Sequence, residues 1–148
     1  MACRVGVIDY KTSNINSVVG ILKLANADVK VVSDLCEFEN FDKIVLPGVG
    51  SFGSAVDYLK KSELDKAIIR EANNNKYILG ICLGMQLLAD YSEESPAKKG
   101  LSLIPGKVKK INNIGSKQLR IPHIGWNEIK KEIETPILKN INNGIDFY

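Results

Sequence analysis

The first 91 residues alternate short apolar runs with stretches of helical periodicity. Each apolar run is bounded by turn-forming residues, which is typical of a buried β-strand. We predict four such strands, at Arg4–Asp9, Val29–Val32, Ile44–Leu46 and Tyr77–Leu79.

Three helices are predicted between and after these strands from apolar residues spaced three and four apart. Ser13 or Asn14 stands where it can cap the first helix. The second helical region covers Ala55–Ala72 and is interrupted near Ser62. The apolar faces of the first and third helices consist of Ile15, Val18, Val19 and Leu22, and of Leu83, Leu87, Leu88 and Tyr91.

This alternation predicts an α/β fold with a mainly parallel sheet covered by helices on both faces. In such a three-layer, flavodoxin-like domain, ligands bind beyond the carboxyl ends of the strands. Asp9, the turn Pro47–Gly50 and Cys82 all follow predicted strands. The sequence therefore directs three distant features to one edge of the sheet.

The pattern changes after Tyr91. A polar loop covers 92–100, and a strand is predicted at Lys107–Ile111. Asn142-Asn143-Gly144 is a strong turn signal, and a further strand begins at Ile145. We expect these elements to form a smaller, antiparallel extension of the domain.

Length and composition indicate one soluble domain spanning residues 1–148, with 45% hydrophobic and 25% charged residues. No apolar run approaches the roughly 18 residues that a membrane span needs, and no secretory signal is visible. We therefore expect a cytoplasmic protein that does not act on membranes. The three cysteines include no CxxC pair, so neither a disulfide framework nor a metal site is expected, and no cofactor is implied.

Residues 98–131 carry nine basic side chains against a single acid, Glu128. A basic face of this kind is open to phosphates or an acidic partner, although a solvated surface is the simpler interpretation. The net charge of +3 is small, and no aromatic side chains are interleaved as in single-strand binders. Nucleic acid is therefore not expected as a partner.

Cys82 is the best candidate for chemistry. It lies between Gly80 and Gly84 at the predicted turn from strand to helix. A nucleophile at such a turn is exposed on a sharp backbone bend, and the adjacent helix N-terminus favours a thiolate. The alternative is a buried structural cysteine, a common fate of this residue.

Glycine-rich residues near Cys82 suggest the rest of the site. The turn Pro47-Gly48-Val49-Gly50 lacks the spacing of a phosphate-binding loop. Its backbone N–H groups, with that of Leu83, are instead suited to an oxyanion hole. Gln86, one turn after Cys82, is placed to bind a substrate head group or is simply a polar surface residue.

A thiol nucleophile needs a base, and His123 is the only histidine in the chain. It lies in a loop rich in Pro and Gly, where a lone histidine is more often structural than catalytic. The residues alone therefore do not reveal a complete catalytic machine.

The segment Gly80-Ile81-Cys82-Leu83-Gly84-Met85-Gln86 resembles the nucleophile motif of class I (triad) glutamine amidotransferases. Three further segments resemble, more narrowly, the glutaminase subunits of imidazole glycerol phosphate synthases. They are Leu46-Pro47-Gly48-Val49-Gly50-Ser51-Phe52-Gly53, Pro122-His123-Ile124-Gly125-Trp126-Asn127 and Phe147-Tyr148.

The resemblance implies hydrolysis of L-glutamine to glutamate and ammonia, which passes to a (β/α)₈ cyclase subunit in a heterodimer. It implies that Cys82 forms a glutamyl thioester and that Gln86 helps to hold glutamine. Gly48, Val49, Gly50 and Leu83 would form the oxyanion hole. Asn14, Trp126 and Asn127 would face the cyclase.

The chain departs from the family pattern in two places. Lys11 and Ser13 replace two glycines of the N-terminal loop that the family places against its partner. The family's catalytic His and Glu lie beyond its Phe-Tyr segment, so we expect this chain to be a C-terminally truncated domain and do not assign their role to His123. Two other functions stay open: ammonia supply for amidated surface polysaccharides, and a non-catalytic module that docks on a partner.

Overall fold

The computed structural model describes residues 2–11, 14–112 and 120–148. The chain forms two compact units, an N-terminal unit of residues 1–110 and a C-terminal unit of residues 111–148. A single domain over all 148 residues stays a prediction. The predicted cap Ser13 lies outside the described residues.

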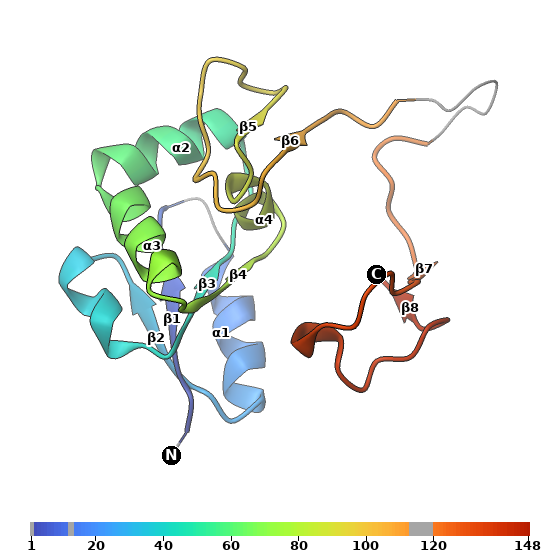
Figure 1. Ribbon diagram of the computed structural model, residues 1–148, viewed down its shortest axis with the longest axis horizontal. Helices are drawn as coiled ribbons and strands as arrows, with labels where there is room; N and C mark the ends of the chain where they lie inside the picture. The colour runs from blue at the N-terminus through green and yellow to red at the C-terminus, as the bar shows by residue number, and fades with distance from the viewer. Residues whose placement is uncertain (1, 12–13, 113–119) are drawn as a thin grey trace. The chain divides into compact units, whose positions relative to one another are not determined.

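The N-terminal unit is built on four parallel strands in the order β2-β1-β3-β4 (Figure 1). The predicted α/β fold with a mainly parallel sheet is therefore confirmed. The strands are β1 (Arg4–Ile8), β2 (Asp28–Val32), β3 (Lys43–Leu46) and β4 (Tyr77–Gly80). The helices are α1 (Ile15–Leu24), the 3₁₀ helix η1 (Leu35–Asn40), α2 (Phe52–Lys61), α3 (Leu64–Asn73) and α4 (Leu83–Leu87).

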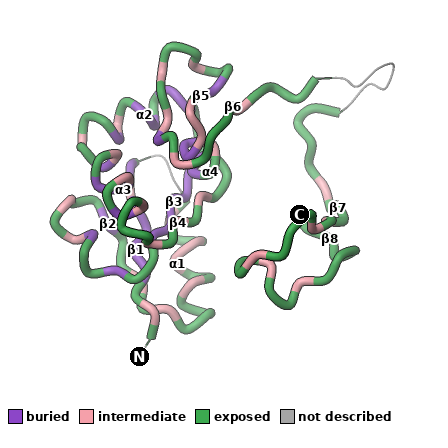
Figure 2. Tube along the Cα trace, in the orientation of Figure 1, coloured by how far each residue is buried: buried purple, intermediate pink, exposed green. Residues whose placement is uncertain are grey.

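Alternating side chains of the strands supply two separate cores, as a three-layer fold requires. On one face, Val5, Val7 and Val45 pack against the predicted apolar face of α1. On the other face, Ile8, Ile44 and Leu46 join the buried residues of α2 and α3. In Figure 2 these buried segments follow the strands and the inner sides of α2 and α3. The break between α2 and α3 falls at the predicted position, because Ser62 ends α2 and Glu63 adopts a left-handed conformation.

The strand β4 differs from the prediction because it is not buried. Tyr77 and Leu79 are 69% and 39% exposed. In the described part of the chain β4 pairs with β3 alone and forms an edge of the sheet. A short apolar run indicates a strand, but it does not distinguish an edge strand from a central one.

The third helix is shorter than predicted, because α4 ends at Leu87 and Tyr91 begins a strand instead. The returning segment 101–103 explains this end. The Leu101 N–H donates to the Leu87 carbonyl at 2.8 Å, and the Leu103 N–H donates to the Leu88 carbonyl at 2.9 Å. These carbonyls are therefore satisfied without further helical turns.

The predicted antiparallel extension is only partly correct. β5 (Tyr91–Ser92) pairs with β6 (Lys107–Val108) in parallel, since the loop between them carries the chain back before β6 begins. In the C-terminal unit, β7 (Asn127–Glu128) and β8 (Asp146–Phe147) are antiparallel, and the 3₁₀ helix η2 (Pro136–Leu138) lies between them in sequence. The predicted turn ends at Gly144, whose φ is 83°.

Within residues 2–11, 14–112 and 120–148, no helix is long and apolar enough to cross a membrane. The same residues include no group of three acidic, histidine or cysteine side chains able to hold a metal ion.

Candidate active site

Cys82 occupies the predicted turn between β4 and α4. Its backbone has φ 55° and ψ −116°, a combination that is rare and strained for a residue with a side chain. The residue is exposed. Strain of this kind is typical of functional positions, and the exposure of the residue excludes the alternative of a buried structural cysteine.

The two glycines that flank Cys82 are required by close packing. A Cβ on Gly84 would overlap the carbonyl oxygen of Leu46, at the end of β3. A Cβ on Gly80 would lie 2.6 Å from the Cα of Met85. The first turn of α4 therefore lies directly against the ends of β3 and β4. This contact fixes the bend that presents Cys82.

The turn Pro47–Gly50, called here the oxyanion turn after its predicted role, lies beside Cys82 as predicted. The pairing of Leu46 with Gly80 brings the ends of β3 and β4 together. The Ile81 N–H donates to the Leu46 carbonyl at 3.0 Å, and the Leu83 N–H donates to the Gly48 carbonyl at 3.3 Å. The Leu83 amide is thus already bonded within the protein.

The other members of the predicted site near Cys82 are more open. Val49 and Gly50 are exposed, and Gly50 has φ 110°, which favours glycine. The Gln86 N–H donates to the Cys82 carbonyl at 3.1 Å within α4, and its side chain is partly exposed. Gln86 is therefore held one turn beyond the thiol.

Asp9 follows β1 at the same edge of the sheet, as predicted. Its carboxylate accepts the Lys11 N–H at 2.8 Å and pairs with the Lys11 ammonium at 3.2 Å. Lys11 is one of the two residues that replace family glycines in the N-terminal loop. Its contacts close the start of the N-terminal loop onto Asp9.

Sequence reasoning gave no role to Tyr10, which the structure places against the oxyanion turn. Its side chain is fully buried, and its phenolic oxygen lies where a Cβ on Gly48 would be. The only sequence signal for Tyr10 was its position just after the first strand, whose carboxyl end lies at the edge of the sheet that carries the site.

The remaining predicted residues belong to other parts of the chain. Asn14 precedes α1, is exposed and makes no side-chain capping bond there. Trp126 packs edge-on against Tyr148 in the C-terminal unit, with ring centroids 5.5 Å apart. In the same unit, His123 Nε2 contacts the side-chain amide of Asn127, and both residues are exposed.

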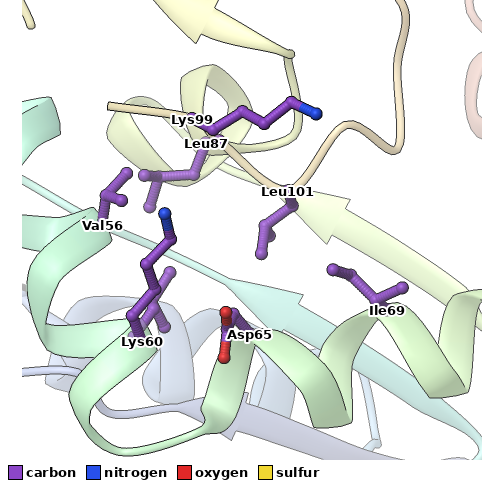
Figure 3. Close-up of a pocket in the computed structure, with 9 residues that line it drawn as sticks. Val56, Lys60, Asp65, Ile69, Leu87, Lys99 and Leu101 are labelled. Carbon is purple, nitrogen blue, oxygen red and sulfur yellow. The ribbon is translucent and has the colours of Figure 1, made fainter. Parts of the chain in front are cut away.

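A small pocket occurs in the N-terminal unit (Figure 3). It is lined by α2, α3, α4 and residues 99–101 and contains no predicted site residue. Figure 3 shows Asp65 near Lys60, with Leu87 and Leu101 across the pocket. The candidate site is therefore the exposed edge around Cys82.

Comparison with known proteins decides the family. The profile described as "Glutamine amidotransferase class-I" matches residues 6–147. The chain belongs to this family. As a class-I glutamine amidotransferase, it carries its cysteine at the turn where the sequence motif predicted a nucleophile.

Two similar relatives are both named imidazole glycerol phosphate synthase subunit HisH. The protein from Pyrococcus furiosus is 43% identical over 145 residues, which are 98% of this chain and 69% of the relative. The protein from Bacillus thuringiensis is 41% identical over 144 residues, or 97% of this chain and 67% of the relative.

Solved structures support the same fold. A crystal structure titled glutamine amidotransferase aligns with a TM-score of 0.65 and 17% identity, covering 84% of this chain and 62% of that chain. A putative peptidase E from Listeria monocytogenes aligns with a TM-score of 0.58 and 16% identity, covering 69% and 63%. This chain thus spans less than two thirds of either structure.

Proposed function

We propose that this amidotransferase is the glutaminase component of an imidazole glycerol phosphate synthase, in histidine biosynthesis. The observation that carries the proposal is the exposed, strained Cys82 turn beside the oxyanion turn. The 41–43% identity to subunits named HisH supports histidine biosynthesis, rather than another pathway, as the use of the ammonia.

In the proposed reaction, the Cys82 thiolate attacks the γ-carbonyl carbon of L-glutamine. The C–N bond then breaks, ammonia leaves with a proton from a general acid, and a glutamyl thioester remains on Cys82. Water attacks the thioester, releases glutamate and returns the thiol. The partly exposed Gln86 binds the glutamine head group.

The negative charge on the carbonyl oxygen develops close to the oxyanion turn. The proposed donors are backbone amides of Gly48, Val49, Gly50 and Leu83. The Leu83 amide is bonded to the Gly48 carbonyl, so this carbonyl rotates away before the donor can act. Each such donor typically contributes about 3 kcal/mol of transition-state stabilisation.

The proposed partner is a (β/α)₈ cyclase subunit that receives the ammonia in a cytoplasmic heterodimer. Asn14, Trp126 and Asn127 are the proposed contacts with this partner. The free cysteines Cys3, Cys36 and Cys82 fit a reducing compartment.

The proposed general base is not His123, whose ring is exposed and contacts Asn127. We place this role in the segment by which the relatives exceed this chain, since the chain covers 67–69% of their length. The 148-residue chain should then bind glutamine analogues much better than it turns glutamine over.

The test measures ammonia release with a cyclase subunit present. It compares this chain, His123→Ala, Cys82→Ala and a chimera extended after Tyr148 with the remaining segment of the Pyrococcus relative. We expect turnover in the chimera, a loss of at least about a thousandfold when Cys82→Ala is introduced into the chimera, and a change below about twofold when His123→Ala is introduced into it. Full activity of the short chain, abolished by His123→Ala, would refute the assignment of the base.

A further inference from the structure

Gly48, in the oxyanion turn, has no room for a side chain, because neighbouring residues occupy the space that a Cβ would need. Its φ is not among the positive values that the structure records for glycines, unlike that of Gly50. A Cβ at this position would overlap the phenolic oxygen of Tyr10 and would lie 3.0 Å from Tyr10 Cζ. The hydroxyl end of Tyr10 is therefore in contact with the backbone of the oxyanion turn.

On its other side, Gly48 is in close contact with α4. A Cβ on Gly48 would lie 3.1 Å from the Cβ of Leu83, and the Gly48 carbonyl accepts the Leu83 N–H at 3.3 Å. Gly48 is thus held between Tyr10 and the residue that follows the nucleophile. A small displacement of Tyr10 would move the turn relative to the Leu83 amide.

Tyr10 itself has a fixed position. It follows Asp9, whose N–H donates to the Val32 carbonyl at 2.8 Å and continues the pairing of β1 with β2. Its ring is 0% exposed and packs in the core that contains Phe52 and Leu83. The pairing of β1 with β2 therefore anchors the phenol that contacts Gly48.

We propose that Tyr10 is a positioning residue of the glutaminase site, which sets the distance between the oxyanion turn and the Leu83 amide. Tyr10 acts through Gly48 and does not touch the substrate. The inference rests on the proposed function, because it assumes that these amides stabilise a tetrahedral intermediate at Cys82.

The experiment compares two reactions of Cys82 in the 148-residue chain. In acylation by a γ-glutamyl p-nitrophenyl ester, the thiolate attacks the carbonyl, the C–O bond breaks, and p-nitrophenolate leaves while a thioester forms. This step needs the oxyanion donors but no proton for the leaving group. In alkylation by iodoacetamide, the thiolate displaces iodide and no oxyanion forms. Cys82→Ala gives the background of both reactions.

We expect Tyr10→Leu to lower the ratio of acylation to alkylation rate constants at least about tenfold, since small misplacements of catalytic groups have large effects on rate. Tyr10→Phe should lower it in the same direction. Tyr58→Phe, on α2 beside the same core, is the matched control and should leave the ratio unchanged. Melting temperatures, measured for each variant, verify that it is folded.

A double-mutant cycle tests the contact itself and decides the question if Tyr10→Leu does not fold. Gly48→Ala should lower the acylation ratio much more in the parent chain than in Tyr10→Phe, where the overlapping oxygen is absent. Additive effects of the two substitutions overturn the inference. The inference is also overturned if the ratio of acylation to alkylation rate constants falls less than tenfold in folded Tyr10→Leu. It is overturned as well if the two rate constants fall in parallel. A parent chain that is acylated no faster than Cys82→Ala instead overturns the proposed function, and the inference with it.

Discussion

At the scale of single residues, two glycines have opposite structural roles. A Cβ on Gly84 would overlap the Leu46 carbonyl oxygen, whereas a Cβ on Gly20, in the exposed middle of α1, would have no neighbour within 4 Å. The first glycine is required by packing. The second only weakens its helix, because glycine has a poor helix propensity.

We therefore predict opposite effects of the same substitution. Gly84→Ala should lower the free energy of unfolding by at least about 2 kcal/mol, because α4 must move away from β3. It should also slow acylation of Cys82. Gly20→Ala should raise the free energy of unfolding by roughly 0.5–1 kcal/mol. Urea denaturation measures the free energy of unfolding of both variants. A change of the same sign and size in the two variants would contradict the packing argument.

The turn from β4 to α4 at Cys82 could be predicted from the motif, because its glycines and its strand-to-helix change are local in sequence. The role of Tyr10 was not predictable in the same way. Its contact with Gly48 joins residues far apart in the chain, and no local pattern of either segment encodes the contact.

At the scale of elements, a buried ion pair holds the end of α3 against η1. Glu71 has a side chain that is 4% exposed and pairs with Lys76 Nζ at 2.7 Å and with Arg70 Nε at 3.0 Å. Lys76 also donates to the Phe38 carbonyl at 2.8 Å. Burial alone raises the pKa of Glu71, but the hydrogen bonds from Lys76 and Arg70 and the positive charges of both side chains together outweigh it and hold the pKa below the ordinary 4.5.

Because the folded state lowers this pKa, the ion pair stabilises the fold fully above about pH 4.5 and loses its contribution as pH falls through the lower folded value. We predict that Glu71→Gln lowers the free energy of unfolding at pH 7 by roughly 3 kcal/mol and flattens its decline in acid. Glu63→Gln, which removes an exposed pair with Lys66, is the control and should change stability little. Chemical denaturation between pH 3 and 7 measures both, and parallel acid profiles would refute the role of Glu71.

The order and type of strands β1 to β4 and helices α1 to α4 followed from apolar periodicity, whereas η1 and β5 were not predicted. The exposure of β4 and the early end of α4 did not follow. Both depend on what lies beside an element: β3 alone beside β4, and the returning segment with Leu101 beside α4.

At the scale of the whole molecule, the cores are confined to one part of the chain. Among the described residues, every buried side chain lies within residues 1–110, and Leu101 is the last of them. The N-terminal unit therefore contains both hydrophobic cores and the turn with Cys82. Apolar burial is the main stabilising contribution to folding.

We predict that a chain ending at Lys110 keeps a cooperative unfolding transition, with a free energy within about 1 kcal/mol of the longer chain. A chain ending at Lys98 is the matched control. It loses Leu101, which is 5% exposed and donates to Leu87, and should be less stable by roughly 2–5 kcal/mol. Calorimetry compares the three chains. An unfolded 1–110 chain would contradict this division of the cores.

The positive φ of Cys82 also bears on protein engineering. Glycine adopts this backbone region freely, whereas another residue is held there at roughly 1–3 kcal/mol of strain. A directed-evolution campaign that selects only for heat resistance would therefore favour glycine at position 82 and discard the thiol. Thermostable variants of this protein need a selection for turnover alongside the selection for stability.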